Sequence, residues 1–394
     1  MKAGCGPTSV VFDGTLGEYD FGPEHPMSPL RVALTMRLAG DLGVLDTLRV
    51  VPAPLASDDL LATVHSAALI DAVQAAGRQP GGYDAAFGLG SDDNPVFAHM
   101  HEAAAHVTGA TVEAMRQVWT GESIHSANIT GGLHHAMPDR VSGFCIYNDV
   151  AVGIRWLLDQ GAQRVAYVDV DAHHGDGVER IFWDDPRVLT ISLHESGEVL
   201  FPGTGFPDDL GGPDASGTAV NVALPPGTAD AGWLRAFHAV VPPVLREWQP
   251  EILVTQHGCD SHLDDPLAHL MLTVDGQRAT YVALHDLAHE LTGGRWVATG
   301  GGGYAVVDVV PRAWSHLLAI VSGRPLDAAT ETPGDWREFV RTSLGRTAPY
   351  RLTDGRNPAW RRWEEGFDPG VALDRAIHAT RAGAFPLHGL DPWP

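Results

Sequence analysis

The sequence has little positive charge, few cysteines and no long apolar run. It carries 26 Lys and Arg residues against 49 Asp and Glu residues, which gives a net charge of −23. Nucleic-acid binding needs a basic surface, so this balance argues against that function. The negative charge favours cationic substrates or partners, and solubility alone explains it equally well.

The three cysteines, Cys5, Cys145 and Cys259, are odd in number and scattered, so they do not make a disulfide framework. No stretch reaches the roughly 18 apolar residues of a membrane-spanning helix. The first residues also lack the apolar core of a signal peptide. We therefore expect a cytoplasmic protein that does not enter a membrane.

Hydrophobic residues make up 44% of the 394 residues, enough for a large core in one or two α/β domains. Short apolar runs alternate with helical patterns, which predicts βαβ units and a parallel sheet. We expect strands over 8–13, 123–129, 164–169, 188–194, 219–224, 252–256 and 296–300, and helices over 30–42, 58–73, 150–158, 233–248 and 279–291. A further helix should begin at Asn94, with Pro95 at its first position, and run to about residue 119.

The most informative stretch is 164–177, where an apolar run ends in several acids and imidazoles. Buried charge is costly unless it is paired or bound to a metal, and ligands of parallel sheets bind at the carboxyl ends of strands. Asp169, Asp171 and His173 alternate, so they point the same way in extended backbone. Asp171 and His173 can then reach one ion, while Asp169 lies deeper. The alternative is a turn that caps a helix near Gly177, but a cap needs only one acid.

In all, five apolar runs end in polar residues or glycine. These ends are His134 with His135, the stretch 169–176, His194, Asp260, and the glycine run 300–303 with Tyr304. Parallel strands bring such ends to one edge of a sheet, so a single site should be assembled from segments about 170 residues apart.

Asp171, His173 and Asp260 are the candidate metal ligands. Two carboxylates and one imidazole leave coordination positions open, as a catalytic metal requires. The oxygen-rich set suits ferrous iron as well as zinc. Taken alone, Asp260 could equally be a solvated loop acid.

His134 and His135 are candidate acid–base groups, with Asp169 and Asp176 available to set their tautomers. The alternative is a pair of core histidines. The glycine run 300–303 is not followed by the residues of a P-loop. It is either a structural turn or bare backbone that lets the Tyr304 phenol reach a developing oxyanion.

Several motifs together resemble those of the zinc-dependent histone deacetylase superfamily, in the family's order, over about residues 8–320. They are Leu-His-His-Ala at 133–136, Gly-Phe-Cys-Ile-Tyr-Asn-Asp at 143–149, Asp-Val-Asp-Ala-His-His-Gly-Asp-Gly at 169–177, Phe-Pro-Gly-Thr-Gly at 201–205, and the glycine run with Tyr304. The segments 25–31 and 90–95 resemble more specifically the bacterial acetoin-utilisation deacetylases, which are similar to class I histone deacetylases.

This resemblance implies a three-layer α/β/α arginase-like fold with a single eight-stranded parallel sheet. It implies a catalytic domain over residues 1–375 and a C-terminal tail over 376–394. It gives the metal to Asp171, His173 and Asp260, and makes the catalytic residues His134, His135, Asp169, Asp176 and Tyr304. In that scheme His135 is the general base and acid, His134 is an electrostatic partner, and Tyr304 donates to the oxyanion.

The resemblance also implies substrate and potassium sites. The residues that would bind the acyl-lysine chain are Asp93, Gly143, Phe144, Phe201, Leu267 and Gly302. One potassium site would use Asp169 and Ser192 with backbone oxygens of Asp171, His173 and Leu193, and a second would use Phe182, Asp185, Val188 and Thr218.

The activity that the resemblance implies is metal-dependent hydrolysis of Nε-acetyl-lysine in proteins, with Zn²⁺ or Fe²⁺ and K⁺ as cofactors and an acyl-CoA synthetase as a candidate substrate. A small-molecule amidohydrolase acting on acetylpolyamines is the alternative. An acyl-lysine binding module would lack a ligand, a base or the tyrosine, and none is missing here. A purely structural role would leave the histidine pair unexplained.

Overall fold

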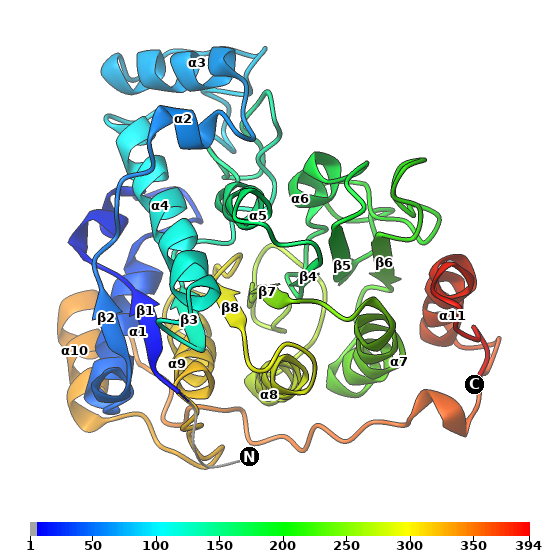
Figure 1. Ribbon diagram of the computed structural model, residues 1–394. Helices are drawn as coiled ribbons and strands as arrows, with labels where there is room; N and C mark the ends of the chain where they lie inside the picture. The colour runs from blue at the N-terminus through cyan, green and yellow to red at the C-terminus, as the bar shows by residue number, and fades with distance from the viewer. Residues whose placement is uncertain (1–5) are drawn as a thin grey trace.

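Across residues 6–394, the part of the chain that the computed structural model describes, one sheet of eight parallel strands forms the centre (Figure 1). Cys5 lies outside these residues. The strands are β1 (Thr8–Val11), β2 (Arg49–Val51), β3 (His125–Asn128), β4 (Val165–Asp169), β5 (Val188–Glu195), β6 (Ala219–Leu224), β7 (Ile252–Gln256) and β8 (Trp296–Thr299). Their order across the sheet is β2-β1-β3-β8-β7-β4-β5-β6, which confirms the predicted fold class.

Helices cover both faces of the sheet. Successive residues of a strand point to opposite faces, so the apolar strands present side chains to be buried on each face. On β4, Val165 and Tyr167 pack into one apolar cluster, while Ala166 and Val168 pack into another. The first cluster includes residues of α2 (Asp58–Leu61), α3 (Ala67–Arg78), α4 (Met100–Trp119), α5 (Asp149–Asp159) and α6 (Asp176–Ile181). The second includes residues of α1 (Leu30–Asp41), α7 (Asp230–Trp248), α8 (Val274–Leu291), α9 (Val310–Val321) and α11 (Ala372–Ala384).

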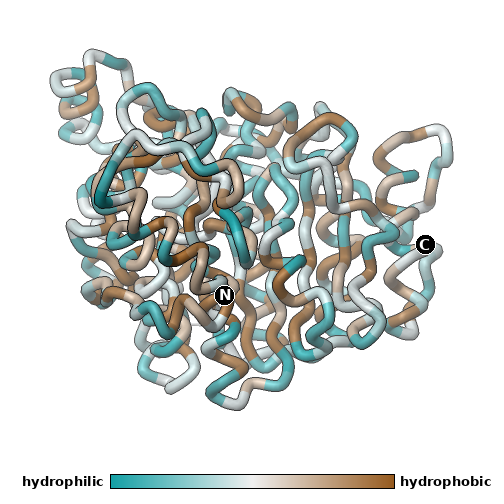
Figure 2. The backbone as a smooth tube through the Cα atoms, turned by 90° about the horizontal axis from the view of Figure 1, so that it is seen from above, coloured by the Kyte–Doolittle hydropathy of each residue, from teal (hydrophilic) through white to brown (hydrophobic). Residues whose placement is uncertain are grey.

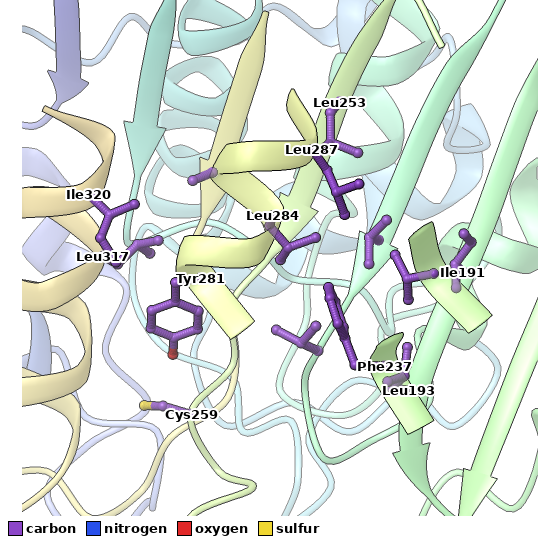
Figure 3. Close-up of a cluster of buried hydrophobic side chains, with 14 of the residues drawn as sticks. Ile191, Leu193, Phe237, Leu253, Cys259, Tyr281, Leu284, Leu287, Leu317 and Ile320 are labelled. Carbon is purple, nitrogen blue, oxygen red and sulfur yellow. The ribbon is translucent and has the colours of Figure 1, made fainter. Parts of the chain in front are cut away.

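The interior face of α8 illustrates how this core is held. Tyr281, Leu284 and Leu287 project from α8 among side chains of α7, α9 and the strands (Figure 3). Burying one large apolar side chain stabilises a fold by about 1.5–3 kcal/mol. Viewed from above, hydrophobic stretches run through the body of the molecule, and much of the hydrophilic chain lies in outer loops (Figure 2).

Two predicted helices differ from the structure. The helix expected from Asn94 begins at Met100, after His99 in a left-handed conformation (φ 60°). Asn94 does not cap it, because its Oδ1 accepts a hydrogen bond from Phe144 N at 3.0 Å. The helix expected over 58–73 is two helices, since Ser66 caps α3 by accepting from Leu69 N at 3.2 Å. The short edge strand β2 was not predicted.

The C-terminal region wraps around the body. Helix α10 (Gly334–Leu344) packs its Trp336 and Val340 against α1. Helix α11 continues through residue 376 and lies along β6, where Thr380 Oγ1 donates to the carbonyl of Asn221 at 2.6 Å. Short 3₁₀ helices occur at Gly14–Glu18, Leu45–Thr47, Trp363–Glu365 and Phe385–His388.

Two further observations concern predictions from composition. Cys145 and Cys259 are buried free thiols, so neither forms a disulfide. Within residues 6–394, no helix combines the length and apolar character needed to cross a membrane.

Candidate active site

Four neighbouring strands deliver the predicted site residues to one edge of the sheet. The strands β3, β8, β7 and β4 are adjacent in that order. The chain reaches His134 and His135 after β3, the glycine run after β8, Asp260 after β7, and Asp171 with His173 after β4. Because all four strands run parallel, these segments meet at one place, as the pattern of strand ends predicts.

Asp171, His173 and Asp260 form a group that could hold a metal ion. Their ligand atoms lie within 4.8 Å of one another, and all three residues are buried. His173 Nδ1 is 3.1 Å from Asp171 Oδ1 and 2.9 Å from Asp260 Oδ2. The three residues that the sequence selected are therefore brought together.

The electrostatics of this group fit a bound cation. Burial and the nearby Asp171 carboxylate raise the pKa of Asp260 to about 7. Two buried carboxylates this close hold either a proton or a positive ion, and the imidazole of His173 supplies the nitrogen ligand. One nitrogen and two oxygen donors suit zinc or ferrous iron, so the donor set does not select between them.

The two adjacent histidines are each backed by a carboxylate. His134 Nδ1 donates to Asp169 Oδ2 at 2.7 Å, and His135 Nδ1 donates to Asp176 Oδ1 at 2.7 Å. The two Nε2 atoms face each other at 3.0 Å. These contacts fix both ring orientations, as acid–base chemistry requires.

The two imidazoles differ in charge preference. Burial opposes the charged form of His134, but the carboxylates of Asp169 and Asp171 outweigh it and raise its pKa to about 9. Burial and the charge of His134 lower the pKa of His135 to about 4, despite Asp176. At neutral pH the pair therefore offers one charged and one neutral imidazole, and such a separation marks distinct acid–base roles.

A cavity of about 200 Å³ opens onto His135 of the histidine pair and His173 of the candidate metal group. It is lined by Asp93, His135, Gly143, Phe144, His173, Leu200, Phe201, Leu267 and Tyr304. The Phe201 ring lies 5.0 Å from that of His135, and the Phe144 ring lies 5.7 Å from that of Tyr304. Burial raises the pKa of Tyr304, so its phenol is a hydrogen-bond donor at neutral pH.

Two glycines make room for the site. A Cβ on Gly143 would lie 2.5 Å from Cδ2 of His135. Gly302 does not line the cavity; its amide donates to Asp171 Oδ2 at 2.7 Å, and a Cβ there would overlap the Asp260 carboxylate. Among the substrate residues implied by resemblance, Gly302 therefore lies beside the candidate metal ligands.

The implied potassium residues lie in two places. Asp169 and Ser192 are paired neighbours on β4 and β5. In the second group, the Phe182 carbonyl accepts from Asp185 N at 3.0 Å and the Asp185 carbonyl accepts from Val188 N at 3.2 Å. The Asp185 carboxylate is already paired with Arg187, at 2.6 Å.

Sequence analysis missed several residues that support the site. Gln256 Nε2 donates to Asp171 Oδ2 at 2.7 Å, and Arg31 Nη1 donates to the Gly301 carbonyl at 2.8 Å. The Asp265 carboxylate accepts from the amides of Tyr304 at 2.8 Å and Leu267 at 3.0 Å. Two of them had a signal in the sequence, since Gln256 ends a buried strand four residues before Asp260 and Arg31 closes the segment 25–31 that resembles the family.

The fold and this site define a hydrolase of the histone deacetylase family, to which the chain belongs. The family model described as "Histone deacetylase domain" matches residues 25–321.

Among curated proteins, the chain is similar to several named "Acetoin utilization protein AcuC". It is 40% identical to the one from Bacillus subtilis (strain 168) over 328 residues, covering 83% of this chain and 84% of the relative. It is 35% identical to the one from Staphylococcus aureus (strain MSSA476) over 359 residues, covering 90% and 92%. The relative from Staphylococcus xylosus is 36% identical over 321 residues, covering 81% and 83%.

Proposed function

We propose that this protein is a metal-dependent deacetylase that hydrolyses the amide of Nε-acetyl-lysine in proteins and releases acetate and free lysine. One observation carries the proposal. The 200 Å³ cavity leads between aromatic walls to a candidate metal group, an imidazole backed by a carboxylate, and a phenol. A narrow cavity of this kind suits an unbranched acyl-lysine chain that enters from the protein surface.

In this proposal Asp171, His173 and Asp260 hold the catalytic metal, with zinc as the first candidate and ferrous iron as the second. When bound, the metal supplies Lewis acidity toward the amide carbonyl and the attacking water. Potassium would bind near Asp169 and Ser192, with the group around Asp185 as a weaker second candidate.

In the proposed reaction His135 carries out both proton transfers, while His134 and Tyr304 stabilise the negative charge that develops. His135 takes the proton of the attacking water at Nε2, since its Nδ1 already donates to Asp176. The same imidazole then gives the proton to the departing lysine amine. Charged His134, held by Asp169, favours the negative charge that develops nearby, and the Tyr304 phenol donates to the oxyanion.

Substrate recognition rests on the walls and rim of the same cavity. Phe144, Phe201 and Leu267 would contact the methylene chain, while Gly143 leaves room beside His135. Asp93 would bind the substrate backbone at the rim. The name of the relatives supports a role in acetoin utilisation. The proposal places the protein in the cytoplasm and takes an acetylated acyl-CoA synthetase as its candidate substrate.

The test is the release of free lysine from an acetyl-lysine peptide. Metal-stripped protein, zinc-loaded protein and zinc-loaded His135→Ala are compared. We expect activity only in the zinc-loaded wild type. Activity that persists in the stripped protein, or in His135→Ala at the wild-type rate, contradicts the mechanism.

The same samples are assayed with acetylspermidine to test the small-molecule alternative. Turnover of acetylspermidine that greatly exceeds that of peptides would replace the protein substrate with a polyamine. For the ligand assignment, Asp260→Ala should lose bound metal, whereas Asp264→Ala, with its side chain 62% exposed, should retain it.

A further inference from the structure

A second group of possible metal ligands lies away from the active site. It consists of His125, His285 and His289, and is called here the three-histidine cluster. His125 is the first residue of β3, and His285 and His289 lie one turn apart on α8. The candidate catalytic residues follow the carboxyl ends of the strands, so this cluster lies at the opposite edge of the sheet.

The cluster has the geometry of a metal site. Its three ligand nitrogens lie within 4.8 Å of one another. The ring centroids of His125 are 4.9 Å from His285 and 5.0 Å from His289, and the latter two rings are 4.6 Å apart. Zinc–nitrogen bonds of about 2.0–2.1 Å place the ligands of a tetrahedral site about 3.4 Å apart. The nitrogens of the cluster would have to move somewhat closer together to bind zinc, and a modest rotation of the exposed His289 side chain achieves this.

A backbone carbonyl holds the His125 ring in the way that metal-binding histidines are usually held. His125 Nδ1 donates to the carbonyl of Val321 at 2.8 Å, which places the lone pair of that ring on Nε2. Ligand histidines commonly donate their other nitrogen to a carbonyl or carboxylate in this way. The His285 ring has the Asp286 carboxylate 3.5 Å from its Nδ1.

The His285 ring lies against Trp296 and the other two histidines of the cluster. His285 is 5% exposed, and neither of its ring nitrogens makes a hydrogen bond to another of residues 6–394. A buried polar atom left without a partner destabilises the fold.

Gly294 packs closely against one side of the cluster. Gly294 has φ +93°, and a Cβ there would lie 3.1 Å from Cε1 of His289. Since His289 is exposed, a water molecule can complete a fourth ligand position.

We propose that the three-histidine cluster binds a divalent transition-metal ion, with zinc as its expected occupant, and that this ion joins α8 to the start of β3. Three imidazole nitrogens suit zinc, copper and nickel, and they offer no oxygen for magnesium or calcium. The site is separate from the candidate catalytic metal, because it shares no residue with that group.

The experiment counts tightly bound Co²⁺ and Zn²⁺ in untagged, metal-stripped protein, in competition with a chelator that removes weak binding. Wild type should bind two equivalents. Asp260→Ala should bind one, and this one should show the absorption of four-coordinate cobalt bound by imidazole nitrogens. Adding His289→Gln to Asp260→Ala should abolish it, whereas adding His238→Gln, on α7, should not.

A stability measurement gives an independent readout. Zinc should raise the thermal midpoint of Asp260→Ala but not that of Asp260→Ala with His289→Gln, and circular dichroism should show that both are folded. Retention of the last equivalent after His289→Gln, or a single equivalent in wild type that Asp260→Ala removes, overturns the proposal. Retention of two equivalents in Asp260→Ala overturns the catalytic assignment and leaves the three-histidine site supported.

Discussion

Gln256 donates a hydrogen bond from Nε2 to Oδ2 of Asp171 at 2.7 Å, at the point where β7 ends beside β4. Its Oε1 accepts from the amide of Gly258 at 2.7 Å, so the orientation of the side-chain amide is fixed. Both residues are buried. The contact aims a candidate ligand without touching the ion, and such contacts commonly account for a tenfold to hundredfold effect on metal affinity.

Gln256→Leu should therefore weaken zinc binding by about 10–100-fold while the protein stays folded. Isothermal titration of the stripped protein measures the affinity. Gln117→Leu is the matched control, because Gln117 is also buried but lies on α4 beside Arg49. Equal affinities in the two variants would show that the Gln256 contact has no influence on the metal group.

Tyr304→Phe should lower kcat for an acetyl-lysine peptide by roughly 10²–10³, the usual cost of removing one oxyanion donor. Metal content should not change, because Tyr304 is not a ligand. Tyr281→Phe is the control, since its hydroxyl has no hydrogen-bond partner among residues 6–394. An undiminished kcat in Tyr304→Phe removes the phenol from the mechanism.

Gly143→Ala should reduce kcat strongly, because the new Cβ would push the His135 ring away from Asp176. The backbone at Gly143 also has φ +53°, where alanine is strained by about 1–2 kcal/mol. Gly121→Ala separates the two effects: it has φ +79° but no atom within 4 Å of the added Cβ. We expect Gly121→Ala to lose stability and keep activity, as judged by urea unfolding and peptide turnover.

His65 should make the fold sensitive to mild acid. Burial lowers its pKa to about 4, while its ring accepts from Asn148 N at 2.9 Å and donates to the Met137 carbonyl at 3.0 Å. In the unfolded chain the His65 imidazole takes up a proton near pH 6.5, whereas in the folded chain it does so only near pH 4. Stability is therefore lost as the pH falls from 6.5 to 4, by up to about 3 kcal/mol.

Urea unfolding at pH 7.5 and pH 4.5 checks this expectation. His65→Gln should be less stable than wild type at pH 7.5 and should lose less stability between the two pH values. Other buried histidines contribute equally to both proteins, so the comparison isolates His65. Parallel losses in the two proteins would contradict the assignment.

Local pattern was enough to place most strands and the residues at their ends. The alternation of Asp169, Asp171 and His173 depends only on strand geometry, and the parallel sheet then brings Asp260 to the same edge. Helix starts were less predictable. Asn94 has the sequence of an N-cap, yet its side chain binds the backbone of Phe144, which is 50 residues away. A contact of that kind leaves no trace in the local sequence.

The sequence by itself determined the parallel α/β architecture, the family resemblance and the residues of the candidate active site, because these depend on short-range periodicity and on motif chemistry. Only the tertiary structure decided that Gln256 aims Asp171, that Asp265 holds Tyr304, and that His125 meets His285 and His289. These residues are far apart in the sequence and are brought into contact by the strand order and the packing of the helices, which local sequence patterns do not predict. Strand and helix geometry determines which side chains of one element share a face, and the packing of the elements determines which side chains of different elements come into contact.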